Sequence, residues 1–349
     1  MSLPHEVSTS GEGTADAGSE RRTRRAEDAC CRARLFLPDA SVRELDCAEL
    51  GSVCPDEDAL LWVDLVRADA DTMRSVWSGC GLPEEMLDQP ADDPAPRLER
   101  FGSHFLVRAI AVVDEGPDGV RGAPLTLVAG DNIVVSVHER DIEFIDELMD
   151  REAVASYIGR LGSDSFVAAL LDWQLSTYFN AVSTFEASVD ALEQAILSER
   201  ADRCLPELRR LRQAAARLRR MLAPHRAVFG ALSRPDFRHD DRPESERHFE
   251  ALDTRFERAM DMIENARTLV VGSFELFSSQ TALRTDRSMR VLTFVTVITG
   301  VLATVAGVLG MNFKAGLFES GNAGFLLVVG GMLVFGGGSV ALARARGWF

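Results

Sequence analysis

Two long stretches without a charged residue, near the C-terminus, constrain this chain more than any other feature. Residues 291–311 read VLTFVTVITGVLATVAGVLGM, and residues 323–343 read AGFLLVVGGMLVFGGGSVALA. At a rise of 1.5 Å per residue, a helix of about 20 residues crosses a hydrocarbon core of about 30 Å. The sequence therefore predicts two transmembrane helices. Two buried helices of a soluble core are the less favoured alternative, since such helices seldom run this far without polar residues.

Arginines flank these stretches on one side only. They stand before the first stretch and after the second, at Arg284, Arg287, Arg290, Arg344 and Arg346. The connecting loop, 312–322, holds Lys314 beside Glu319. Because positive residues collect on the cytoplasmic side, we expect a plasma-membrane protein whose termini, including the short tail 344–349, lie in the cytoplasm.

Residues 161–290 carry helical periodicity and predict a stalk. Apolar residues recur every three or four positions in three segments, around 182–196, 208–222 and 249–277. No proline follows Pro243, so one helix is expected from about 247 to 311, roughly 100 Å long. The two earlier segments are expected to pack antiparallel along it.

Residues 32–160 have a different pattern, with short β-like runs at 33–37, 60–66, 104–113 and 132–137 and a helical piece at 141–151. This predicts a cytoplasmic α/β domain and, for the chain, an α+β membrane protein. Residues 1–31 are rich in charged and small residues and predict a disordered tail. The six cysteines form no CxxC pair and are expected to be reduced thiols.

The composition and motifs exclude several functions. A formal net charge of -16 argues against nucleic acid as a partner and makes cations the more natural ones. The chain contains no GxGxxG, P-loop, nucleophile elbow or HExxH, so the sequence predicts neither an enzyme nor a catalytic cofactor. The lack of a P-loop also argues against an ATP-driven pump. Any ion flux would then follow the electrochemical gradient, although coupling to protons stays open.

The first span ends in the tripeptide Gly310, Met311 and Asn312, followed by Phe313. Alone, such a tripeptide is better explained as a glycine helix end with an asparagine cap. Its position at the end of the first of two C-terminal spans, after a stalk and an α/β domain, resembles the CorA family of magnesium and related metal-ion channels. Segments 289–294, 61–65, 96–101 and 134–139 also resemble family landmarks.

The resemblance implies a homopentamer in which the first span of each subunit lines the pore. The tripeptide would form the selectivity ring at the outer entrance, because Mg²⁺ releases its water reluctantly and suits neutral carbonyl oxygens. One face of the same helix carries a small and mildly polar stripe: Met289, Leu292, Thr293, Thr296, Gly300, Ala303 and Gly307. From the residues alone, a tight helix-packing seam is favoured over a pore as the explanation of this stripe.

The sequence departs from the family pattern at several positions. Asp286 stands where the family commonly has an asparagine at the cytoplasmic end of the pore, and five carboxylates there would concentrate divalent cations. Alternatively, Asp286 pairs with a neighbouring arginine and faces outward. In the outer loop, Glu319 is the nearest match to the family's glutamate. Mg²⁺, with Co²⁺ or Ni²⁺ as further cargo, is the predicted substrate, and a zinc-transporting branch is the alternative.

Regulation in the family involves divalent ions that bridge the N-terminal domain of one subunit to the stalk of the next. By its spacing from Pro96, Asp88 matches the N-terminal carboxylate of that site. Its stalk partner falls near Ala251, between Glu250 and Asp253. Solvated surface acids are the other interpretation. A membrane-anchored sensor that no longer conducts ions is the competing function for the whole chain.

Overall fold

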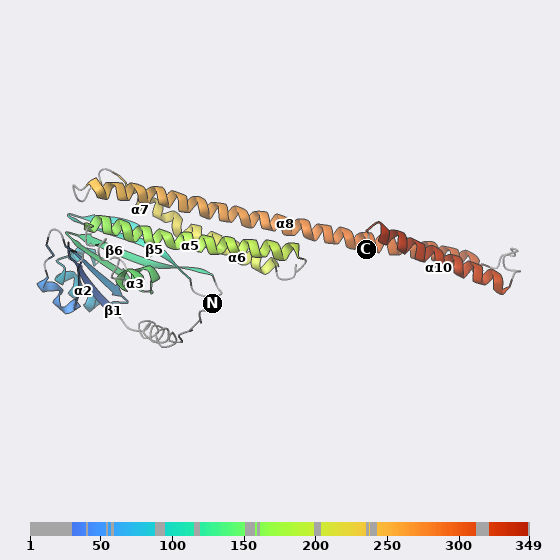
Figure 1. The fold of residues 1–349 in the computed structure, drawn as a ribbon, viewed down its shortest axis with the longest axis horizontal. Helices are drawn as coiled ribbons and strands as arrows, with labels where there is room; N and C mark the ends of the chain where they lie inside the picture. The colour runs from blue at the N-terminus through green and yellow to red at the C-terminus, as the bar shows by residue number, and fades with distance from the viewer. Residues whose placement is uncertain are drawn as a thin grey trace, which may run out of the picture. The chain divides into compact units, whose positions relative to one another are not determined.

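The structure of the chain is a computed structural model. It describes residues 30–39, 41–53, 55–56, 59–87, 95–114, 119–150, 158, 161–198, 204–234, 237, 243–311 and 321–347. These residues form two compact units. The first unit comprises Met1–Ala191 and Pro206–Val270, and the second comprises Leu192–Leu205 and Val271–Phe349. An α/β domain, long helices and two apolar C-terminal helices confirm the predicted fold class (Figure 1).

The first unit is built on a seven-stranded mixed sheet in the order β2-β1-β3-β7-β6-β5-β4. Every pairing in it is antiparallel except that of β3 with β7. The strands are β1 (Cys30–Phe36), β2 (Val42–Leu45), β3 (Leu60–Val66), β4 (Arg97–Phe101), β5 (His104–Asp114), β6 (Val120–Gly130) and β7 (Ile133–His138). The four predicted runs are β1, β3, β5 and β7. The tail predicted for 1–31 lies almost wholly outside the described residues, and β1 already includes its last two.

The described helices include those that the periodicity predicted, together with several that it did not predict. They are η1 (Cys47–Ser52), α2 (Ala70–Gly79), η2 (Glu84–Met86), α3 (Glu143–Asp150), α5 (Ser163–Leu197), α6 (Cys204–Leu222), η6 (Ala223–His225), α7 (Arg226–Leu232), α8 (Pro243–Leu309) and α10 (Asn322–Ala345). The unbroken helix expected over 247–311 is α8, which runs for 67 residues. Its buried seam in the first unit includes Phe249, Leu252, Phe256 and Ile263.

One face of the sheet carries an apolar core. Alternate residues of the central strands, among them Leu61, Val63 and Val135, join residues of η1 and α2 in this cluster. The two helices approach closely, because a Cβ added to Gly79 would lie 3.2 Å from the Leu50 Cβ. Glycine at position 79 therefore allows α2 to pack on η1.

The structure corrects the prediction for the cysteines. Cys31 of β1 and Cys47 of η1 form a disulfide, with their Cα atoms 6.3 Å apart. Cys80 and Cys204 are buried and lie outside this disulfide. The two bonded cysteines are 16 residues apart in sequence, and the prediction missed them because the β1–β2 hairpin, which brings them together, was not recognised.

The opposite face of the sheet holds a buried charged network centred on Asp64 of β3. Its carboxylate accepts hydrogen bonds from Arg32 Nη2 (2.6 Å), Ser136 Oγ (2.6 Å) and His138 Nε2 (3.1 Å). The other ring nitrogen of His138, Nδ1, lies 2.6 Å from the Arg140 carbonyl oxygen, which only accepts. Both nitrogens of His138 therefore donate, and the ring is positively charged.

The network holds its charges against the cost of burial. Burial alone disfavours the ionised carboxylate, but hydrogen bonding and charge from His138, followed by Arg32 and Ser136, keep the pKa of Asp64 below its usual value. Burial likewise opposes the charged imidazole, yet Asp64 raises the pKa of His138. Arg32 also bonds Asp146 of α3 at 2.7 Å, so the network ties that helix to the sheet.

A second set of polar contacts secures the outer edge of β5. Strand β4 begins at Arg97, opposite Arg108, so among the described residues no strand lies beside β5 beyond Arg108 on this side. The Ile110 N–H donates to His225 Nε2 (2.9 Å), and its carbonyl accepts from Gln174 Nε2 (2.5 Å) and Tyr178 OH (3.0 Å). Side chains from α5 and η6 thereby replace a missing strand.

Replacing Asp64 by asparagine leaves the buried Arg32 and His138 charges without their anion. We expect Asp64→Asn to lower the free energy of unfolding by about 3–5 kcal/mol. His138 has a raised pKa, so its share of this stability is complete below about pH 6.5 and is lost as pH rises through the raised value. Denaturant unfolding followed across pH should therefore show the deficit of Asp64→Asn narrowing on the alkaline side. A deficit independent of pH would contradict the charged state of His138.

His225 is expected to make the folded protein less stable as the pH falls. Burial lowers the pKa of His225 to about 4, since the neutral ring must accept the Ile110 N–H. Between about pH 6.5 and this value the unfolded chain takes up a proton that the folded chain does not, so stability falls by about 3 kcal/mol. His225→Gln keeps an acceptor without a titrating ring. Parallel unfolding titrations should show a shallower acid loss in the variant, and equal slopes would disprove this role.

Candidate functional site

The second unit contains two helices long and apolar enough to cross a membrane. These are the C-terminal part of α8 and the whole of α10, and their most apolar windows are not buried within the chain. Figure 1 shows α10 running beside the end of α8. The connecting residues 312–320 lie outside the described residues. The two helices contain residues 291–309 and 323–343, which make up nearly all of the two stretches from which the sequence predicts spans.

One face of α8 packs on α10. Its half-buried residues recur at helical spacing, at Val291, Phe294, Ile298, Leu302 and Leu309. On α10 the buried and half-buried residues are mostly small: Gly324, Val328, Gly330, Met332, Gly336, Ser339 and Ala343. A Cβ added to Gly336 would lie 3.9 Å from Leu302 Cδ1, in ordinary van der Waals contact. Small residues on α10 therefore form the packing seam of the hairpin.

The predicted stripe on α8 lies on the other face. At about 100° per residue, Met289, Thr296, Gly300 and Gly307 fall on the side of the helix opposite Leu302. All seven residues of the stripe are exposed, with Met289 at 57% and Leu292 at 61%. A Cβ added to Gly300 or Gly307 would meet nothing within 4 Å. Packing against α10 does not require these glycines to be small.

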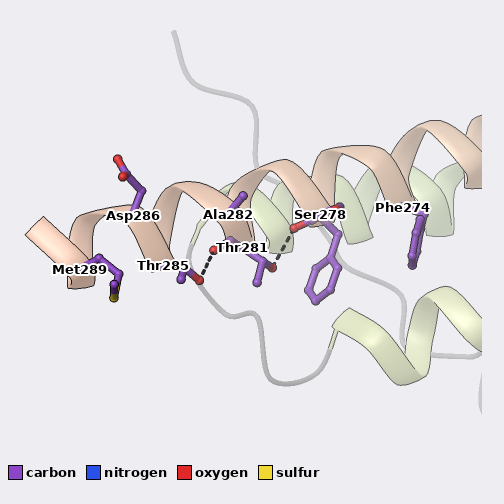
Figure 2. A pocket seen from close by; sticks show the side chains of 8 residues that line it. Phe274, Ser278, Thr281, Ala282, Thr285, Asp286 and Met289 are labelled. Atoms are coloured by element: carbon purple, nitrogen blue, oxygen red, sulfur yellow. Dashed lines mark hydrogen bonds between the residues drawn. The ribbon is translucent and has the colours of Figure 1, made fainter.

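A shallow apolar groove continues this face toward the N-terminus of α8, outside the span (Figure 2). It is lined by Phe274, Phe277, Ser278, Thr281, Ala282, Thr285, Asp286 and Met289. Thr281 and Thr285 turn their hydroxyls back to carbonyls of the preceding turn, which leaves little polarity on the groove. The face is therefore continuous from about Phe274 to Gly307.

Asp286 makes the ion pair that the sequence offered as an alternative. Its Oδ2 lies 2.5 Å from Arg290 Nη2, one turn further along α8, and both side chains are exposed. Figure 2 shows the carboxylate pointing away from Thr285 and Met289. In a single chain Asp286 is thus at the border of the predicted stripe, turned toward Arg290.

The end of α8 presents part of the expected tripeptide. The helix ends at Leu309, and Gly310 N–H still donates to the Ala306 carbonyl at 2.9 Å. Met311 is 54% exposed. Asn312 and the loop residue Glu319 lie outside the described residues. The described part of the tripeptide is therefore an exposed helix end rather than a buried turn.

The predicted regulatory residues are only partly described. Asp88 lies outside the described residues. Glu250 is exposed and Asp253 half-buried on α8, and within the described part of the chain neither carboxylate makes an ion pair. Over the same residues, no group of three or more His, Cys, Asp and Glu side chains is placed to hold a metal ion. The structure thus brings no complete metal site together within one chain.

Sequence reasoning missed the residues that support these elements. Asp64 lies in segment 61–65, which resembles a family landmark, but the sequence predicted no role for Asp64 or for His225. A buried aspartate in an otherwise apolar strand, LLWVDLV, is the signal that points to a charged partner. No comparable signal in the sequence identifies His225.

Comparison with known proteins supplies the family. Residues 57–344 match the profile described as CorA-like Mg²⁺ transporter protein. The chain is 23% identical over 278 residues to the cobalt/magnesium transport protein CorA of Thermotoga maritima, covering 78% of this chain and 79% of the relative. It is 25% identical over 285 residues to the divalent cation transporter CmaX of Pseudomonas aeruginosa, covering 79% and 84%.

Solved structures agree with this fold. The complete CorA magnesium transporter of Methanocaldococcus jannaschii matches with a TM-score of 0.71 and 20% identity, over 92% of this chain and 99% of that one. The ZntB cytoplasmic domain of Vibrio parahaemolyticus matches with a TM-score of 0.56 and 12% identity, over 73% and 98%. The fold therefore agrees with the matched profile, whose description is that of a transporter, and the relatives from Thermotoga maritima and Pseudomonas aeruginosa are named as transport proteins. The chain belongs to the CorA-like Mg²⁺ transporter family.

Proposed function

We propose that this chain forms a homopentameric pore for divalent cations, with Mg²⁺ as the main cargo and α8 of each subunit lining the path. The observation that carries the proposal is the division of α8 into two faces. Leu302 and its neighbours are covered by α10, whereas Gly300 and Gly307 lie on a face that the other described residues leave open. A stripe of small and mildly polar residues on that face can border water.

Several copies are needed because one helix encloses no path. In a symmetric ring each residue of the stripe appears once per subunit, so a residue such as Thr296 becomes a ring of hydroxyls. Its own hydroxyl now donates to the Leu292 carbonyl at 2.8 Å, which leaves the oxygen able to accept from a hydrated ion. Such a ring takes one ligand from each subunit, so it would not appear as a group of metal ligands among the described residues of one chain.

Mg²⁺ is favoured over zinc by the type of ligand. Asn312, at the expected outer mouth, offers an amide oxygen, and the stripe offers hydroxyls and carbonyls rather than thiolates or imidazoles. The names of the relatives from Thermotoga maritima and Methanocaldococcus jannaschii refer to cobalt and magnesium. Transport of Co²⁺ or Ni²⁺ is part of this proposal. Zinc is the competing cargo, since a ZntB domain shares the fold.

Asp286 is the cytoplasmic end of the proposed path. Its carboxylate is one side of an exposed pair with Arg290, and such pairs are weak enough to exchange partners. In a pentamer five carboxylates at this level would attract divalent cations leaving the pore. We place Glu319 near the outer mouth, and both termini in the cytoplasm because arginines flank the two spans.

The proposed regulatory site joins Asp88 of one subunit to the stalk of the next near Glu250 and Asp253. The support for it is that these two stalk carboxylates are accessible and unpaired within the described residues. Paired carboxylates across an interface repel unless a cation lies between them, so bound Mg²⁺ would hold the subunits together.

Ion flux into liposomes tests the function directly. Purified protein should admit Mg²⁺ down its gradient, with Co²⁺ and Ni²⁺ as further cargo, and Asn312→Ala should abolish this uptake because the amide ring at the entrance is lost. Fluorescent indicators inside the liposomes report each metal separately. A preference for Zn²⁺ would reassign the cargo. No flux of any metal from correctly assembled pentamers would favour the non-conducting sensor.

Substitutions on the two sides of α8 test the path itself. Gly300→Leu should reduce Mg²⁺ flux by at least about tenfold, since five leucines at one level form a hydrophobic constriction. Val301 is the matched control, because it is exposed on the same turn but lies off the stripe. Val301→Leu should retain flux. Equal effects of the two substitutions, at equal expression and assembly, would show that Gly300 does not face the path.

A further inference from the structure

The Cys31–Cys47 disulfide is unexpected for the compartment proposed above. Both cysteines belong to the first unit, which the arginine pattern places in the cytoplasm. Cytosolic thiols are kept reduced by the glutathione and thioredoxin systems, and disulfides that do form there are usually transient or sensory. This inference therefore rests on the proposed orientation of the chain.

The disulfide lies at the edge of the sheet that β2 and β1 form. Strand β2 has four residues and is the outermost strand, paired only with β1 in the described sheet. The disulfide joins β1 to η1, the short helix that follows β2. Leu50 of η1 packs into the core against Gly79 of α2. β2 pairs with β1 through four residues and η1 buries Leu50, and the disulfide adds a covalent bond between η1 and β1.

The bond also adjoins the buried charges. Cys31 precedes Arg32, and in the β1–β3 ladder these residues lie opposite Leu65 and Asp64. Successive side chains of a strand point to opposite faces, so the disulfide lies on the apolar core face and the guanidinium on the face of the network. The residue next to Cys31 in β1 is therefore the one that bonds Asp64 and Asp146 of α3.

We propose that Cys31 and Cys47 form a reversible thiol–disulfide switch that sets the local stability of the β2–β1 edge. Oxidation joins the two thiols with loss of two electrons and two protons. A low-molecular-weight disulfide such as oxidised glutathione takes up these electrons and protons and becomes two thiols. The reverse exchange releases η1 from β1. Both cysteines are partly exposed, which gives small thiols access to the bond.

Hydrogen exchange of the full-length protein in detergent tests the switch. Samples are equilibrated in glutathione buffers from mostly oxidised to mostly reduced, and thiols are counted by alkylation and mass spectrometry. We expect the pair to become reduced when reduced glutathione is in large excess. Exchange over 41–53 should then accelerate by at least about tenfold, since the cross-link no longer restricts the open state. Exchange in α5 should stay unchanged.

Two variants serve as controls. Cys47→Ser should show the fast exchange in every buffer, whereas Cys80→Ala removes a buried thiol outside the bond and should respond like the wild type. A bond that stays oxidised in reducing glutathione, or exchange over 41–53 that is the same in both states, would overturn the switch. None of these measurements needs ion transport, so they stand or fall independently of the proposed pore.

The orientation is checked in intact cells. A membrane-impermeant thiol reagent, added after reduction, should label Cys31 and Cys47 only once the cells are opened. Labelling from outside would place the first unit in an oxidising compartment. The disulfide would then be a structural bond that stays oxidised, and the switch would be disproved.

Discussion

The unsatisfied edge of β5 is the constraint on which the first unit depends. Beyond Arg108 the strand has no neighbouring strand on one side among the described residues, and a buried backbone group without a partner costs as much as a lost hydrogen bond. His225, Gln174 and Tyr178 supply the partners of Ile110 from the helical layer. These bonds fix where α5 and α6–α7 meet the sheet. The Asp64 network does the same for α3 on the same sheet.

A different constraint governs the second unit. In lipid every backbone group must bond within its own segment, so the spans are helices and their side chains alone decide which surfaces meet. Small residues on α10 let it approach Leu302 of α8. This contact occupies one face of α8 and leaves the face of Gly300 and Gly307 for other copies or for water. The division of one helix into two faces is what connects its packing to the proposed path.

Elements with a regular apolar pattern were predictable, because each apolar position in them must be buried. The apolar run of β3, interrupted only by Asp64, predicted a strand, and the regular seam of Phe249, Leu252 and Phe256 predicted α8. The sequence did not predict β6, because Pro124 and two glycines are residues that strands disfavour. Pro124 is tolerated there since its partner in the ladder is Ile110, whose carbonyl already accepts from two side chains of α5. Local sequence carries no sign of such a remote partner.

The sequence by itself determined the two spans, the long helix that leads into the first of them and the family motif at its end. Each of these depends on length, hydropathy or adjacency along the chain. The tertiary structure decided which face of α8 stays open, that Asp286 turns to Arg290, and that Cys31 meets Cys47. These outcomes depend on which segments and rotamers come together in space. The physical reason is that hydropathy acts residue by residue, whereas packing, pairing and cross-linking act between residues the chain must first bring together.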